Sequence, residues 1–268
     1  MKHRTDHLEY IARSPWTSKR GDIIHLFTGG SELHGAKVEG TDDHDIYGVF
    51  VDRPTGPLGI DYQDRTSQHF VWSTAGQGRR NTKADVDITL YSLQKWAYLA
   101  CKGNVTILHF LFTPNAHEIE SNTRTVWRKI IRTRKLFLAR SQLKGLFGFA
   151  DNQYHRVIGQ KGSGKKGQRP ELIDAHGYDT KAAMHALRIL YETHELIGTG
   201  KLTLPNPNKD LLIAIRRGEW SLEKFVKTYE KMKKACMKAQ SSSPLSDMID
   251  RLAVSKLISK CYLEHWGK

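Results

Sequence analysis

The fold is decided by a short stretch, Ile23-Ile24-His25-Leu26-Phe27-Thr28-Gly29-Gly30-Ser31, and by a second one, Asp43-His44-Asp45-Ile46-Tyr47-Gly48-Val49-Phe50-Val51. Each contains a short apolar run bounded by polar residues or glycine, which predicts two strands joined by a Gly-Ser turn and a brief excursion. Successive side chains of a strand point to opposite faces. The side chains of Asp43 and Asp45 are therefore expected on the same face.

This pair of carboxylates indicates a cation site. Two like charges held close together repel each other unless a cation lies between them. Carboxylates suit Mg²⁺, which commonly binds one or two of them together with substrate phosphates. The backbone N–H groups of Gly30 and Ser31 are open to a phosphate because no large side chain covers them. Together these features favour nucleotide transfer, with an ordinary turn and an exposed loop as the alternative.

The spacing of these residues resembles the signature of the DNA polymerase β-like nucleotidyltransferase superfamily. An apolar residue and Gly30-Ser31 are followed, after 11 residues, by Asp43-His44-Asp45 and an apolar residue. The resemblance implies that Asp43 and Asp45 bind Mg²⁺ or Mn²⁺ and that Gly30 and Ser31 hold the phosphates of a nucleoside triphosphate, with ATP as the expected substrate. His44 departs from the pattern, because the superfamily usually has an apolar residue there.

A more specific resemblance covers most of residues 20–225. Three segments are similar to the RNA-repair-pathway DNA polymerase β family, a branch of bacterial and phage nucleotidyltransferases. The segments begin at the glycine turn, at Asp87-Ile88-Thr89-Leu90-Tyr91-Ser92 and at His176-Gly177-Tyr178-Asp179-Thr180-Lys181, and they continue to Val51, Phe112 and Glu219.

The resemblance implies a third catalytic and metal-binding carboxylate, Asp87, beside Asp43 and Asp45. Asp85 is held in reserve because it shares a strand face with Asp87. Asp87 would lie nearest the attacking hydroxyl in a two-metal transfer. The plain alternative for Asp87 is a solvated strand residue.

A cationic helix face follows Tyr178. Lys181, His185 and Arg188 are spaced by four and three residues, which places them on one face. We expect Lys181 and Arg188 to contact nucleotide phosphates, with His185 assisting, and a solvated helix face is the alternative. His109 stands where the family is expected to carry Glu, so the role of that acid is altered or lost in this chain.

The composition is that of a globular protein. The chain has 268 residues, and no apolar run approaches the roughly 20 residues that span a bilayer. The first residues lack the apolar core of a signal peptide. Cys101, Cys236 and Cys261 have no paired spacing, which favours reduced thiols and a cytoplasmic location over disulfides or zinc.

The net charge of +14 is concentrated in one region. Residues 121–170 contain one acid, Asp151, and 13 basic residues: Arg124, Arg128, Lys129, Arg132, Arg134, Lys135, Arg140, Lys144, Arg156, Lys161, Lys165, Lys166 and Arg169. Such a region is typical of a partner that is a polyanion, and RNA is favoured over a merely solvated surface. Residues 159–166 imitate a phosphate-binding P-loop, but Lys166 replaces its Ser or Thr and no apolar strand precedes it.

The pattern predicts an α/β (α+β) protein with a polymerase β-like core, a mixed sheet and a C-terminal helical domain. A third strand is expected at 85–91, helices at 93–100 and 105–112, and a loop-rich insertion at 53–84. Further helices are expected within 121–150 and at 179–197, 220–239 and 246–266, the last with Leu252, Ile258 and Tyr262 on its apolar side. The expected domains are 1–125, catalytic, and 126–268, basic and mainly helical.

The sequence therefore predicts a Mg²⁺-dependent nucleotidyltransferase whose acceptor is an RNA end. Two alternatives remain open: transfer to a protein or small molecule, and a catalytically silent module that binds nucleic acid. Only transfer to an RNA end requires both RNA and the carboxylates for activity. A membrane partner is not expected.

Overall fold

A computed structural model describes seven segments of the chain: residues 9–38, 44–60, 68–76, 85–115, 118–120, 124–159 and 169–267. Asp43 and most of the basic loop, residues 160–168, lie outside them. Contacts between residues divide the chain into two compact units, each made of separate segments. The first contains Met1–Ala100, Thr113–Phe137 and Asp250–Lys268, and the second contains Cys101–Phe112 and Leu138–Ile249. The expected domains 1–125 and 126–268 stay a prediction, and this division differs from them in returning the C-terminal segment to the first unit.

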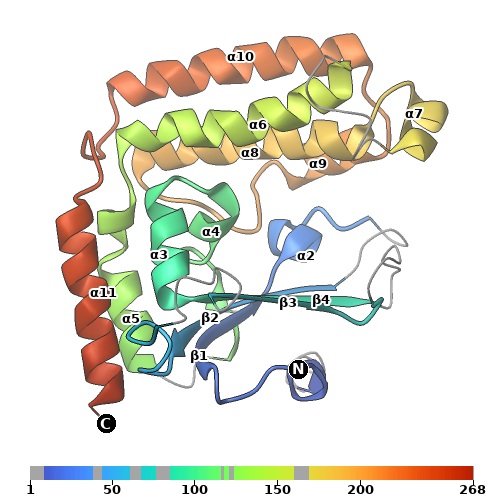
Figure 1. Ribbon diagram of the computed structural model, residues 1–268. Coiled ribbons are helices and arrows are strands. Elements are labelled where there is room, and N and C mark those ends of the chain that lie inside the picture. Colours follow the sequence, from blue (N-terminus) through green and yellow to red (C-terminus); the bar gives the residue numbers. More distant parts are fainter. Residues whose placement is uncertain are drawn as a thin grey trace. The chain divides into compact units, whose positions relative to one another are not determined.

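The first unit is built on a five-stranded mixed sheet with the order β3-β4-β2-β1-β5. Figure 1 labels β1, β2, β3 and β4. Its strands are β1 (Gly21–Thr28), β2 (His44–Asp52), β3 (His69–Ser73), β4 (Val86–Ser92) and β5 (Glu118–Glu120). β2 pairs with β4 in parallel, whereas β1–β2, β3–β4 and β1–β5 are antiparallel. The three predicted strands are confirmed, and so is the α/β class.

β3 lies inside the segment that was predicted to be loop-rich. It pairs with β4 from His69 to Ser73, and Phe70 is buried in the core cluster of the sheet. The same cluster contains Ile46 of β2 and Ile88 and Leu90 of β4, with Trp16 packed against it. A five-residue strand among glycines and prolines has too short a pattern to stand out in the sequence.

The C-terminal helix α11 (Arg251–Trp266) is fixed to the end of β2 within this unit. The Tyr262 hydroxyl donates to Asp52 Oδ2 at 2.6 Å, and Trp266 Nε1 donates to the Asp52 carbonyl oxygen at 2.8 Å. His265 Nε2 lies 2.9 Å from Asp22 Oδ2 of β1. The helix begins five residues later than predicted, and Leu252 is 65% exposed, so placing Leu252 on the buried side was wrong. Its buried residues are Val254, Ile258, Cys261 and Tyr262.

Further helical segments of the first unit are α3 (Leu93–Cys101), which the division assigns to it as far as Ala100, α5 (Arg124–Arg132) and the 3-10 turn Arg134–Phe137. Trp127 of α5 stacks on His25 of β1, with ring centroids 4.3 Å apart. Burial lowers the pKa of His25 to about 3, so this ring is a neutral part of the core.

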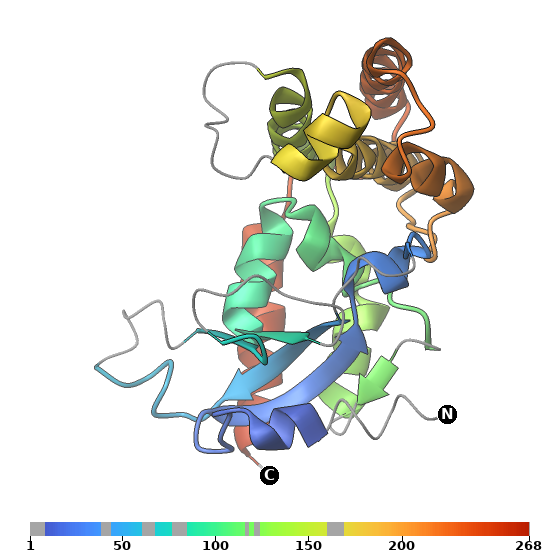
Figure 2. The ribbon, with the colours of Figure 1, turned by 90° about the vertical axis from the view of Figure 1, so that its right-hand side faces the viewer.

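The second unit is helical. Its elements are α4 (Val105–His109), the 3-10 turn Arg140–Gln142, α6 (Leu143–Ile158), α7 (Pro170–His176), α8 (Thr180–Thr199), α9 (Lys209–Arg216) and α10 (Leu222–Ser241). α8 packs against α6, α9 and α10, and Figure 2 shows these long helices from a second side. α7 and α9 were not predicted.

The ends of the long helices follow the expected capping chemistry. The Asp179 carboxylate accepts from the Ala182 N–H at 2.9 Å, and Ser221 Oγ accepts from the Lys224 N–H at 3.2 Å. Gly200 ends α8 with a φ of 68°, a conformation that favours glycine. Within the described parts of the chain, no helix has the length and apolarity needed to cross a membrane. All three cysteines are free thiols.

Candidate functional site

Two of the predicted carboxylates face each other across neighbouring strands. Asp45 of β2 and Asp87 of β4 are register partners in the parallel pair. Neighbouring strands are about 4.8 Å apart, and side chains at paired positions project on the same face of a sheet. Both residues are partly exposed. The structure therefore brings Asp45 and Asp87 together, while Asp43 lies outside the described residues.

The glycine turn lies directly against Asp45. The Gly29 N–H donates to the Asp45 carbonyl oxygen at 2.8 Å. Gly30, the first residue of the short helix α2 (Gly30–His34), has a φ of +59°. A Cβ atom at Gly30 would collide with the Asp45 carboxylate. Only glycine fits at this position. The backbone at Gly30 therefore lies directly beside the Asp45 carboxylate.

The reserve carboxylate, Asp85, has a different environment. It precedes β4, is 9% exposed, and its Oδ1 accepts from the Thr74 hydroxyl at 2.9 Å. Thr74 Oγ1 in turn accepts from the Val86 N–H at 2.9 Å. Asp85 thus helps to fasten the end of β3 to β4. Asp87 lies in strand register with Asp45 and stays the predicted third ligand.

The donor set at this place fits a hard divalent cation. Asp45 and Asp87 supply carboxylate oxygens from two rigid strands, and the space that a side chain at position 30 would need is taken by the Asp45 carboxylate. Mg²⁺ and Mn²⁺ favour such oxygen donors. These two residues could therefore hold the metal that the sequence predicts.

Asp52, at the opposite end of β2, is a carboxylate of another kind. It is 3% exposed, and burial raises its pKa to about 6 against the opposing effect of the hydrogen bond from Tyr262. It holds α11 through its side chain and its carbonyl oxygen. Six residues of β2 lie between it and Asp45, so it is not part of the carboxylate pair.

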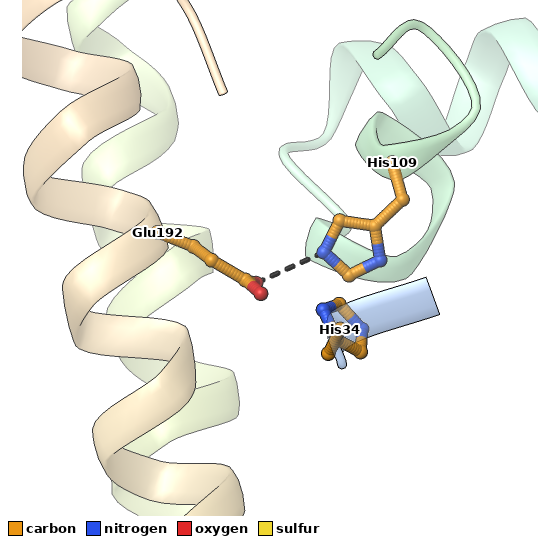
Figure 3. Close-up of side chains that lie close together, drawn as sticks. All are labelled: His34, His109 and Glu192. Atoms are coloured by element: carbon orange, nitrogen blue, oxygen red, sulfur yellow. Dashed lines mark hydrogen bonds and ion pairs between the residues drawn. The ribbon is translucent and has the colours of Figure 1, made fainter. Parts of the chain in front are cut away.

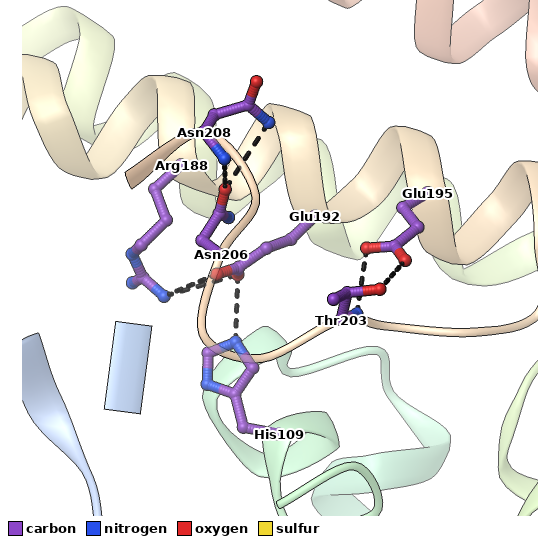
Figure 4. A network of polar contacts seen from close by, with 7 residues as sticks. All are labelled: His109, Arg188, Glu192, Glu195, Thr203, Asn206 and Asn208. Atoms are coloured by element: carbon purple, nitrogen blue, oxygen red, sulfur yellow. Dashed lines mark hydrogen bonds and ion pairs between the residues drawn. The ribbon is translucent and has the colours of Figure 1, made fainter. Parts of the chain in front are cut away.

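The predicted cationic face of α8 belongs to the second unit and is only partly exposed. Lys181 and His185 are partly exposed, but Arg188 is 8% exposed. Arg188 Nη1 lies 3.2 Å from Glu192 Oε1 and 3.3 Å from Oε2 (Figure 4). A solvated helix face, the alternative, does not describe Arg188, which is buried with its charge balanced by Glu192 one helical turn later. Phosphate contacts by Lys181, His185 and Arg188 stay predictions.

Glu192 is the residue that the sequence reasoning missed. It is 1% exposed, and its Oε2 lies 2.9 Å from His109 Nε2 of α4 (Figure 3). One buried carboxylate therefore serves both Arg188 and His109 within the second unit. The i, i+4 spacing of Arg188 and Glu192 was the available signal. His109, for which the sequence predicted the altered or lost role of an acid, is thus the partner of an acid on another helix.

A mixed sheet whose glycine turn lies against one of two in-register strand carboxylates defines a nucleotidyltransferase-like protein. The model of the RNA repair pathway DNA polymerase beta family matches residues 2–258 of the chain. The chain belongs to this family.

Two further comparisons are weaker. An uncharacterized 38.9 kDa protein from Enterobacteria phage T4, encoded in the nrdC-mobD intergenic region, is 30% identical over 134 residues. That match covers 50% of this chain and 38% of the phage protein, so the chain matches well under half of that relative's length. The crystal structure of a nucleotidyltransferase-like protein from Exiguobacterium sibiricum aligns at 12% identity with a TM-score of 0.30, over 98% of this chain and 76% of that one. A likeness at this level says nothing about function.

Proposed function

We propose that this protein transfers a nucleoside monophosphate from a nucleoside triphosphate to the hydroxyl of an RNA end, with release of pyrophosphate. The observation that carries this proposal is the register pairing of Asp45 and Asp87 beside Gly30. Family membership supports nucleotidyl transfer in general. Family membership does not specify the acceptor, the metal ion or the nucleotide, and these are proposed in addition.

Each residue of the site has a role that its chemistry allows. Asp45 and Asp87, joined by Asp43 from outside the described residues, would hold Mg²⁺ or Mn²⁺. Such a cation neutralises charge on phosphate oxygens and lowers the pKa of a bound hydroxyl. The Gly30 and Ser31 backbone and the Ser31 hydroxyl would hold the β- and γ-phosphates of the triphosphate, with ATP as the first candidate. Because both strands are central in the sheet, the carboxylates are held in place before substrate arrives.

RNA is the proposed acceptor because of charge and family. The chain carries +14, and the family's description names an RNA repair pathway. The region 124–169, predicted to bind RNA, contributes less free charge than its sequence suggests. Lys129 pairs with Glu264, Arg140 with Asp247, and Arg169 with Asp179. Its remaining basic residues keep their predicted role.

The test is a labelling experiment with the full chain. The protein is incubated with each α-³²P-labelled nucleoside triphosphate and Mg²⁺, with and without RNA. Asp45→Asn and Asp87→Asn each preserve side-chain size and remove one carboxylate charge. Asp210→Asn, at an exposed position of α9, is the matched control. We expect RNA-dependent label that falls at least ~100-fold in either strand variant and is unchanged in the control.

Three results would contradict the proposal. Label on protein without RNA would move the acceptor to a protein. Label that persists in both strand variants would separate the activity from the carboxylates. Absence of label with every nucleotide and with Mn²⁺ in place of Mg²⁺, from protein with a cooperative thermal transition, would reject nucleotidyl transfer.

A further inference from the structure

One face of α10 carries a row of lysines that the basic region 124–169 does not include. Its members are spaced by 3, 4, 3 and 4 residues, and all are exposed: Lys224, Lys227, Lys231, Lys234 and Lys238. Residues at such spacing lie above one another on a helix. At 1.5 Å per residue the row extends about 21 Å. We call these five residues the lysine row.

The helix that carries the row is firmly held within its unit. Its opposite side buries Phe225, Tyr229 and Cys236, and α10 packs along α8. Tyr229 Oη donates to Asp151 Oδ1 of α6 at 2.6 Å, and Lys233 Nζ lies 2.7 Å from the same oxygen. Lys233 is therefore a structural cation, and it lies off the row.

In the part of the chain that the structure describes, no carboxylate pairs with a lysine of the row in this way. Lys224 lies over the ring of Trp220, 4.1 Å from its centroid, a contact that leaves the positive charge in place. Among the residues that the structure describes, no carboxylate lies within ion-pair distance of Lys227, Lys231, Lys234 or Lys238. Glu223 and Glu230 flank the row on the same helix without closing onto it. The row thus repeats one sign of charge along a rigid edge.

We propose that the lysine row binds the phosphate backbone of single-stranded RNA without regard to sequence. A linear array of point charges matches a linear polyanion, and ammonium groups contact phosphates without reading bases. An anionic membrane fits less well, because a membrane-binding helix needs a free apolar face and that of α10 is buried in the unit. The choice of RNA as ligand rests on the proposed function, whereas the row itself does not.

The experiment measures binding of the full chain to a fluorescein-labelled 20-nucleotide single-stranded RNA by anisotropy, across a salt series. Lys231→Gln/Lys234→Gln removes two charges from the centre of the row with little change in helix propensity. Lys256→Gln/Lys260→Gln removes two exposed charges from α11 and is the matched control. Each lost phosphate contact should reduce the slope of log K against log salt by about 0.7. We therefore expect the slope of the row variant to be smaller by about 1.4 and its affinity at 0.1 M salt to be roughly 20-fold lower. The control should keep most of the parent's slope and affinity.

The outcomes separate this inference from the proposed function. If the row variant binds RNA as the parent does, while RNA-dependent labelling persists, the lysine row is not the binding surface and the transferase remains. If the parent transfers no nucleotide but RNA binding depends on the row, the transferase fails and the row stands. Equal losses of RNA affinity in the row variant and in the α11 control would mean that binding depends on the total charge of the protein and not on the row. Binding of anionic vesicles without binding of RNA would mean that the partner is a membrane and not RNA.

Discussion

α8 and α10 lie side by side in the second unit, are each 20 residues long, and place their charges in opposite ways. α8 buries 13 of its residues, among them Arg188 and Glu192. α10 buries three, all uncharged in the fold, and presents its lysines to solvent. The charges of Arg188 and Glu192 on α8 are therefore buried, whereas those of the lysine row on α10 are exposed.

The difference shows what each charge can do. A buried ion must be compensated where it stands, because taking it out of water costs several kcal/mol. Arg188, Glu192 and His109 therefore have to occupy one arrangement, shown in Figure 4. An exposed lysine has no such constraint, contributes little to stability, and keeps its charge for a partner in solution. The buried charges of α8 thus help to specify its packing, whereas α10 pairs Lys233 with Asp151 of α6 and keeps the lysine row in solvent.

The strongest way to break the comparison is Glu192→Gln. The variant keeps the shape of the side chain but removes the carboxylate charge that lies against the buried Arg188 guanidinium. We expect a loss of about 3–5 kcal/mol in the free energy of unfolding, measured by urea denaturation. Glu195→Gln is the matched control, because Glu195 lies on the same helix and accepts at a more exposed position from the Thr203 N–H at 3.0 Å. Equal losses in the two variants would mean that α8 does not depend on its internal charge.

Asp52→Asn sharpens the comparison, because the charge of the buried Asp52 carboxyl group lowers the free energy of unfolding whereas the charge of Glu192 raises it. Asp52 has a pKa of about 6 in the folded protein against 3.8 for an ordinary carboxyl, mainly because it is buried. The folded state therefore holds the proton more tightly, and Asp52 destabilises the protein as the pH rises through 6. We expect the variant to be more stable than the parent at pH 8, by up to about 3 kcal/mol.

The parent protein and Asp52→Asn should have similar free energies of unfolding in acid. Below about pH 4 the parent carboxyl is protonated in both states, so its cost disappears. Thermal melts of parent and Asp52→Asn at pH 4, 6 and 8 check this dependence. A stability difference that is the same at all three values would assign the effect to the hydrogen bond from Tyr262 and not to the charge.

The N-caps of the two helices should differ as their surroundings do. Asp179 is fully buried, caps α8 and accepts from Arg169 Nη1 at 3.3 Å. Ser221 caps α10 at an exposed position. We expect Asp179→Ala to cost about 2 kcal/mol and Ser221→Ala about 0.5–1 kcal/mol in the free energy of unfolding. The reverse order, measured in the same denaturant, would contradict the contrast between the helices.

The sequence predicts well what depends on local chemistry. The strands around Ile24, Ile46 and Ile88 follow from their apolar runs, and Asp179 and Ser221 are residue types whose side chains readily accept hydrogen bonds from the first turn of a helix. The pairing of Asp45 with Asp87 was expected only through the family resemblance, because a parallel pair joins distant segments and no local pattern fixes its register.

What the sequence did not reveal depends on tertiary contacts. Arg188 belongs to a cationic face by its spacing, and only the packing of α8 shows that Glu192, which also contacts His109, balances its charge inside the unit. Leu252 belongs to an apolar helix face by pattern, yet it is exposed because α11 turns Val254 and Ile258 toward its neighbours. Both errors arise where burial overrides periodicity.

The smallest expected effect is the most direct test of the external role of α10. Lys231→Gln/Lys234→Gln should change the free energy of unfolding by less than about 0.5 kcal/mol, because exposed lysines without ion pairs stabilise little. Because repulsion along the row is relieved, we expect the melting temperature to rise slightly in low salt and to stay unchanged in high salt. Thermal melts at the two salt concentrations measure both effects. A loss of stability comparable with that of Glu192→Gln would show that the row is structural, and its charges would then no longer be free to hold a phosphate backbone.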